Sequence, residues 1–139
     1  MLTIPTLGHT DAAKAVKAIG DAIAAEGKNA VIAVADQQGE LIALSRLDGA
    51  PYPSILIAAN KAWTAARERT PSMHIGQAAR AIGRGFDMGS YGDARYTGFG
   101  GGIPVILDGR VLGAVAVSGL STDEDIEFAQ KGVDAILRR

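Results

Sequence analysis

The run Gly-Phe-Gly-Gly-Gly-Ile-Pro at residues 98–104 has the composition of a ligand-binding loop. Glycine adopts backbone conformations that other residues avoid, and it lets a ligand approach the main-chain amides closely. Because a strand is expected to follow, the run is neither a dinucleotide fingerprint nor a P-loop, which both need the amino end of a helix. The alternative is a bent entry into that strand. The residues expected to contact a ligand are Phe99, Gly100, Gly101, Gly102 and Pro104.

Three other residues are candidates for transferring a proton beside this loop. Lys61 lies in an alanine-rich segment, and a lysine removed from water can act as a base or bind an anion. The alternative for Lys61 is a side chain that extends along its helix into solvent. Asp48 and Tyr96 could also move the proton if they lie within hydrogen-bond reach. Arg46 can pair with Asp48 across a turn, or it can bind a ligand carboxylate.

The metal-binding potential of the sequence rests on two histidines, His9 and His74. They are far apart, and no His-Glu-x-x-His motif is present. The absence of cysteine excludes disulfides and thiolate ligands. His74 is a candidate axial ligand of haem iron, since imidazole is a common ligand of that metal. The alternative for His74 is a surface or helix-capping role.

Basic side chains are concentrated between residues 61 and 84, where the only acid is Glu68. Such a cluster usually marks a solvated helix face. It also suits an anionic ligand, such as the propionates of haem or a small organic acid. Its members are Lys61, Arg67, Arg69, Arg80 and Arg84.

The overall composition excludes several classes of protein. Of the 139 residues, 47% are hydrophobic and 21% are charged, as expected for a folded domain. The net charge of −1 gives no general attraction to phosphate backbones, so we expect no nucleic-acid partner. No apolar run is long enough to cross a bilayer, and the amino-terminal residues do not resemble a secretory signal. We therefore expect a cytoplasmic protein with no membrane partner.

Periodicity and turn signals predict one α+β domain over residues 1–139. Turns are expected at residues 36–39 and at Asp108-Gly109, and Ser121 and Glu124 form a capping box. Because two hairpins are not stable alone, they should join in one antiparallel sheet that helices cover. The expected helices are 10–26, one from Ser54 to Pro71, 72–82 and one after Ser121; the expected strands are 30–35, 41–47, 103–107 and 110–117, with a loop at 85–102.

Several segments, in matching order and spacing, together resemble the GlcG/HbpS family, which includes the carboxy-terminal domain of PduO. They lie at residues 32–36, 46–50, 54–55, 60–65, 70–71, 99–104, 108–109, 111–114 and 117–119. The resemblance implies a profilin-like antiparallel sheet of five strands with helices on both faces. It also implies a homo-oligomer, and haem as a possible cofactor. Cobalamin adenosylation is not implied, because no adenosyltransferase domain precedes these segments in the sequence.

Three functions follow from these features. The first is a small-molecule-binding protein that binds or handles haem, with His74 on the iron and Arg67, Arg80 or Arg84 at the propionates. The alternative is an enzyme of small-carbon-compound catabolism, which transfers a proton on a small oxygenated acid or carbonyl substrate at Lys61 and the 100–102 loop. The third is an accessory protein whose glycine loop packs at a subunit interface. The family resemblance favours haem binding.

Overall fold

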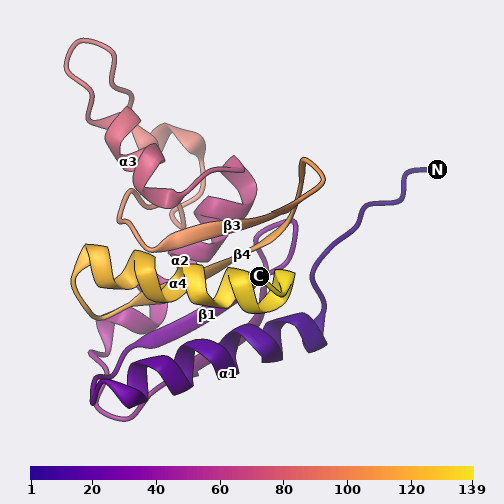
Figure 1. Cartoon of the computed structure of the whole chain (residues 1–139). Coiled ribbons are helices and arrows are strands. Elements are labelled where there is room, and N and C mark those ends of the chain that lie inside the picture. Colours follow the sequence, from indigo (N-terminus) through magenta and orange to yellow (C-terminus); the bar gives the residue numbers. More distant parts are fainter.

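The computed structural model describes residues 1–139 as one antiparallel sheet with helices on both faces (Figure 1). The order of the elements is the predicted one, so the α+β class is confirmed. The elements are α1 (His9–Ala25), β1 (Val31–Ala35), β2 (Leu41–Arg46), α2 (Pro53–Glu68), α3 (Ser72–Ala79), the 3-10 helix η1 (Met88–Tyr91), β3 (Gly102–Leu107), β4 (Arg110–Ser118) and α4 (Thr122–Leu137).

The sheet has four strands in the order β2-β1-β4-β3, and not the five that the family resemblance implied. The two predicted hairpins are present, and β1 and β4 join them through antiparallel pairing of Val31 with Ser118 and of Ala35 with Ala114. The chain between α3 and β3 adds no strand. This segment is rich in glycine, which is depleted in strands, and it folds into turns around η1.

Successive residues of β1 point to opposite faces of the sheet, as strand geometry requires. Ile32 and Val34 belong to the larger core, which α1 and α4 cover. Ala33 and Ala35 belong to the second core, beneath α2. Because alanine dominates that second core, the backbone of α2 lies close to the sheet.

Local signals in the sequence explain where the elements begin and end. Asp36 Oδ1 accepts hydrogen bonds from the amides of Gln38 and Glu40 at 2.9 and 3.0 Å, which closes the β1–β2 turn. Ser121 Oγ accepts from the amide of Glu124 at 3.2 Å, so the predicted capping box starts α4. The predicted helix 72–82 ends earlier, at Ala79.

No helix has both the length and the apolar character required to cross a bilayer.

Candidate functional site

Lys61 is a buried lysine, with a relative exposure of only 3%. Helix α2 carries it on the side that faces the sheet and the start of α4, between the buried residues Ala58 and Ala65. Its Nζ atom donates to the carbonyl oxygen of Val117 at 2.9 Å and to Asp125 Oδ2 at 3.0 Å. The expectation that this side chain reaches solvent is therefore wrong, and the expectation of a desolvated lysine is confirmed.

Asp125 is the partner of Lys61, and its side chain is 5% exposed. The capping box at Ser121 sets the first turn of α4, where Asp125 lies. Its second carboxylate oxygen, Oδ1, accepts from the amide of Leu120 at 3.1 Å. The positive end of the helix dipole also favours a carboxylate in the first turn. The pair thus joins residues 64 positions apart in the sequence.

Burial shifts the pKa of each member of the pair in the direction that favours its neutral form. It lowers the pKa of the Lys61 amine, and the charge of Asp125 opposes that shift. It raises the pKa of the Asp125 carboxyl group, against the effects of Lys61 and the Leu120 amide. Desolvation is the larger cause in each case, because few waters reach either group.

The glycines of the 98–104 run pack against this pair. A β-carbon at Gly101, whose φ angle is 123°, would lie 2.9 Å from Lys61 Nζ. One at Gly102 would lie 2.8 Å from the carbonyl carbon of Lys61. Ser72 fixes the run from α3, since its Oγ accepts from the Gly102 amide at 2.9 Å and donates to the Phe99 carbonyl at 2.6 Å. Gly101 and Gly102 therefore allow α2 and the run to approach each other.

A hollow of about 310 Å³ opens beside the Lys61–Asp125 pair. Of the residues expected to bind a ligand, Lys61, Phe99 and Gly100 line it, and Phe99 is 60% exposed. Gly101, Gly102 and Pro104 are buried and do not line it. The remaining lining residues are Ser54, Ile57, Ser118, Gly119, Leu120, Thr122 and Asp125.

Sequence reasoning missed Asp125 as a site residue, although a signal was present. Asp125 is one of three acids in the first turn of α4, where acids commonly stabilise the positive end of a helix. It also falls three and four residues before Phe128 and Ala129, on the face of α4 that is buried. A charge on the buried face of a helix requires a partner of opposite charge, which Lys61 provides.

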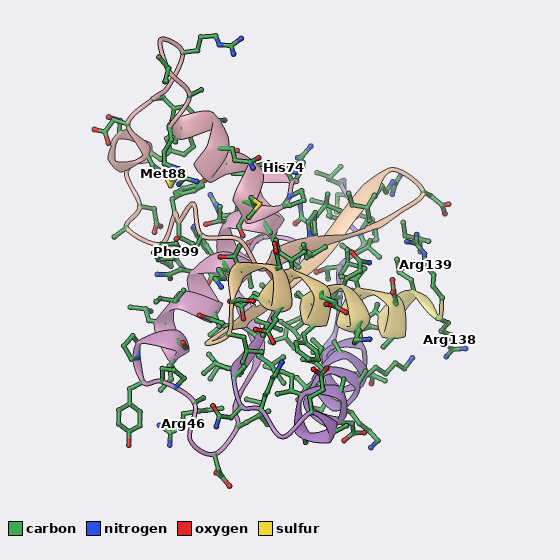
Figure 2. The ribbon with its side chains drawn as sticks, turned by 60° about the vertical axis from the view of Figure 1, so that its left-hand side comes forward. Arg46, His74, Met88, Phe99, Arg138 and Arg139 are labelled. Carbon is green, nitrogen blue, oxygen red and sulfur yellow. The ribbon has the colours of Figure 1, made fainter.

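Arg46 and Asp48 lie elsewhere, at a separate hollow of about 370 Å³ after β2. They form no ion pair; the Arg46 guanidinium lies over the Tyr52 ring, 5.3 Å from its centre. In Figure 2 Arg46 is at the lower end of the molecule, well below Phe99 and His74. The two residues therefore do not converge on Lys61.

Tyr96 is also absent from the Lys61 hollow. Its ring packs edge-on against Trp63 and Tyr91, with centres 6.4 and 4.9 Å apart. The guanidinium groups of Arg67 and Arg95 lie over the Trp63 ring at 4.3 and 3.3 Å from its centre. This aromatic cluster holds the segment before β3 against α2. The predicted basic patch is not a continuous exposed surface, since Lys61 is buried and Arg67 stacks on the Trp63 ring.

His74 lies on the solvent-exposed side of α3, opposite the buried Ser72 and Gly76. Its Nδ1 atom is 3.2 Å from the hydroxyl oxygen of Thr70. None of the four principal hollows is lined by His74. No group of three or more His, Cys, Asp or Glu side chains is arranged to hold a metal ion.

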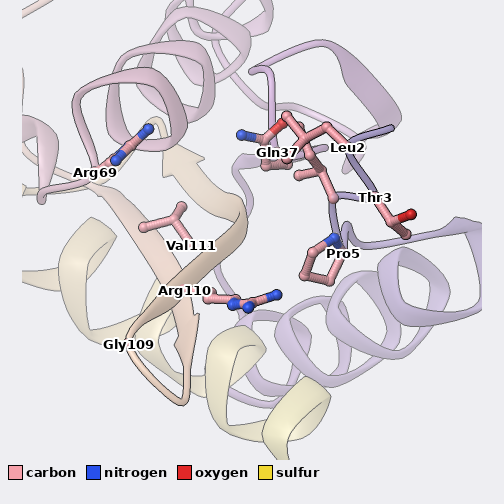
Figure 3. Close-up of a pocket in the computed structure, with 9 residues that line it drawn as sticks. Leu2, Thr3, Pro5, Gln37, Arg69, Gly109, Arg110 and Val111 are labelled. Carbon is pink, nitrogen blue, oxygen red and sulfur yellow. The ribbon is translucent and has the colours of Figure 1, made fainter.

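The amino-terminal segment forms one side of another hollow, of about 340 Å³ (Figure 3). Leu2, Thr3 and Pro5 face Arg110 at the β3–β4 turn and Arg69 after α2. Of the candidate binding residues that the sequence singled out, only Arg69 of the basic cluster lines this hollow.

Comparison with known proteins finds a matching family and several relatives. A family model described as "Haem degrading protein HbpS-like" matches residues 7–134. An uncharacterised 15.0 kDa protein of Citrobacter freundii, from the dhaT-dhaS intergenic region, is 36% identical over 104 residues, which are 75% of this chain and 73% of that protein. Corrinoid adenosyltransferase PduO of the same species is 28% identical over 106 residues, covering 76% of this chain but 32% of PduO.

Two solved structures show the same fold. Klebsiella pneumoniae protein ORFY has a TM-score of 0.91 at 28% identity, covering 100% of this chain and 96% of ORFY. A complex of PduOC with haem has a TM-score of 0.85, covers 94% of each chain and is 24% identical, so that similarity concerns the fold alone.

Proposed function

Because the chain belongs to the HbpS-like family, we propose that it is a small-molecule-binding protein that binds or handles haem. The observation that carries the proposal is the family match over residues 7–134, nearly the whole chain. The PduOC structure contains haem on the same fold, which is consistent with it.

The exposed residues around α3 fit the chemical groups of haem. The imidazole of His74 is exposed and can reach an iron ion. Arg80 and Arg84 are exposed and form no salt bridge, so their guanidinium groups are free for propionates. Ile82 and Phe99 expose 99% and 60% of their surface, which offers apolar contacts to a macrocycle. Haem would therefore lie against the surface near α3, since no principal hollow contains His74.

The contact between His74 and Thr70 supports a role in iron binding. When Nδ1 donates to the Thr70 hydroxyl, the lone pair of the neutral ring is on Nε2. A hydrogen bond from the second ring nitrogen is the usual way in which a protein orients a metal-binding imidazole. Haem, when bound, would supply a redox-active iron. His74 would hold that iron, and Arg80 and Arg84 would pair with the propionates.

Hemin titration tests this proposal, with the chain's other exposed histidine as a matched control. The wild-type protein and the His9→Ala variant should give a sharp Soret shift that saturates at a fixed stoichiometry. The His74→Ala variant should give a different or weaker spectrum. A wild-type protein without a saturable shift would refute haem binding, and an unchanged His74→Ala spectrum would refute the ligand assignment.

A second candidate function is proton transfer on a small oxygenated acid or carbonyl compound. The observation that favours it is the buried Lys61 at the wall of a hollow that also includes Gly100. Asp48 and Tyr96 do not line this hollow, and Asp125 is the acid beside Lys61. The test is exchange of solvent deuterium into pyruvate, followed by NMR. Lys61→Met should abolish exchange and Lys131→Met should not; equal rates in all three proteins would exclude this role.

We also propose that the protein is cytoplasmic and forms a homo-oligomer. Several large apolar side chains are exposed in a single copy, including Leu41 and Leu44 on the edge strand β2 and Leu56 on α2. Contact between copies would cover such side chains. Light scattering coupled to size-exclusion chromatography should give a mass of at least twice the monomer mass of 14.3 kDa. A monomeric mass at all concentrations would refute the oligomer.

A further inference from the structure

We propose that Lys61 is the site at which a small aldehyde or ketone condenses with this protein as a Schiff base, inside the hollow beside Asp125. The hollow is separate from the proposed iron and propionate contacts, because His74, Arg80 and Arg84 do not line it; Phe99 alone belongs to both surfaces. Schiff-base formation also differs from the proton-transfer role, since it forms a covalent bond to the protein.

The geometry leaves one hydrogen of the Lys61 ammonium group available to a guest molecule. A lysine has three N–H donors, and two of them are directed to Val117 O and Asp125 Oδ2. The amine and the carboxylate both belong to residues that line the hollow. A carbonyl oxygen in the hollow can therefore accept the third hydrogen, which places its carbon next to Nζ.

The hollow also defines the class of guest. Its volume of about 310 Å³ is at the lower limit of small-molecule sites, so it admits a small compound. The buried residues Ser54 and Ser118 line it and bring hydroxyl groups, while Ile57 and Gly119 bring apolar surface. A short carbonyl compound with a hydroxyl substituent matches this lining.

The pair can provide a neutral amine without leaving a net charge in the interior. Burial lowers the pKa of Lys61 and raises the pKa of Asp125, so both shifts favour proton transfer from the amine to the carboxylate. The total charge of the pair is zero before and after this transfer. The neutral amine is the nucleophile that lysine uses with carbonyl substrates.

The condensation balances without any oxidant or reductant. The lone pair of Nζ forms a bond to the carbonyl carbon, and the carbonyl oxygen takes a proton from the attacking nitrogen to give a neutral carbinolamine. Asp125 then gives its proton to that hydroxyl group, which leaves as water while the C=N bond forms. The product is a protonated imine beside the Asp125 carboxylate. One water is released for each carbonyl compound bound.

Reductive trapping on the haem-free protein tests the inference. The probe is glycolaldehyde, a two-carbon aldehyde with a hydroxyl group, at neutral pH with cyanoborohydride and a short exposure. Peptide mapping should find the adduct mainly on Lys61, because the lowered pKa of its amine leaves a larger fraction of it neutral than of the other lysines. The other lysines, Lys14, Lys17, Lys28 and Lys131, are internal controls in the same chain. An unmodified Lys61, or one modified no faster than these, overturns the proposal.

Two neighbouring residues of α2 provide a matched pair of variants. Ile57 lines the hollow, whereas Leu56 does not line it and is 65% exposed. Ile57→Phe should narrow the hollow and reduce the Lys61 adduct, and Leu56→Phe should leave the adduct unchanged. Equal labelling of Lys61 in both variants would show that the hollow is not the binding site. The His74→Ala variant should be labelled like the wild type, which separates this result from haem binding.

Discussion

Gly76 of α3 and Gly98 lie in direct backbone contact, so closely that a β-carbon at Gly76 would be 2.8 Å from the α-carbon of Gly98. Gly20 of α1 differs, since a β-carbon there would meet only the Ile32 side chain, at an ordinary 3.9 Å. Gly76 and Gly20 are both helical, so alanine substitutions at these two positions form a matched pair for testing the contact.

We expect Gly76→Ala to destabilise the protein by about 1–3 kcal/mol, because overpacking forces the backbone apart. Gly20→Ala should instead stabilise it, by up to about 1 kcal/mol, through helix propensity. Urea denaturation measures both effects. A Gly76→Ala variant as stable as Gly20→Ala would contradict the close contact between α3 and the glycine run.

Breaking the Lys61–Asp125 pair should cost more than removing it. Lys61→Met alone leaves a buried carboxylate without its partner, a change that costs about 3–5 kcal/mol in buried pairs. The double variant Lys61→Met, Asp125→Asn has no buried charge and should regain at least half of that loss. Lys17→Met, at an exposed pair with Asp21, is the control and should show no measurable change. Additive losses in the double variant would mean that the two side chains are not coupled.

The same pair predicts a characteristic pH dependence of stability. The folded-state pKa of Asp125 is raised, so its stabilising contribution is present at low pH and is lost as the pH rises through that value. The folded-state pKa of Lys61 is lowered, so its contribution increases as the pH rises from that value toward the unfolded one. The pair thus stabilises the fold least in the range between the two folded-state values.

Melting temperatures between about pH 3 and about pH 11, which bracket the usual carboxyl and amine pKa values, measure this effect. The melting temperature of the double variant minus that of the wild type should be largest near neutral pH and should decrease toward both extremes. Taking the difference removes the contribution of all other titrating groups. A difference that does not vary with pH would contradict the pKa shifts.

Trp63 should report on the segment that precedes β3, because it is the only tryptophan and is 3% exposed. Arg95 covers its ring and also pairs with Asp93 and Glu40. Arg95→Met should shift Trp63 emission to longer wavelength and increase acrylamide quenching, since water reaches the ring. Arg84→Met is the control and should leave the emission unchanged. Unchanged emission in both variants would mean that Arg95 does not shield the ring.

The sequence predicted the elements well where the signals are local. The turns at Asp36 and at Asp108-Gly109 and the capping box at Ser121 each depend on residues a few positions apart, and all three are present. The fifth strand was wrong because it came from the family resemblance and not from a strand pattern in the chain. Of the candidate site residues, Lys61, Phe99 and Gly100 line one hollow, whereas Arg46, Asp48, Tyr96 and His74 lie elsewhere.

The sequence by itself determined the order of helices and strands and the candidate residues of the glycine run, because composition, periodicity and turn chemistry act over short distances. The family followed from the resemblance of ordered segments and from the family match. Only the tertiary structure decided that Lys61 meets Asp125, and that Gly101 and Gly102 make room for α2. Those contacts join segments far apart in the chain. The charges of Lys61 and Asp125 are paired because a lone charge is unstable away from water. No local sequence pattern identifies which residue pairs with Lys61.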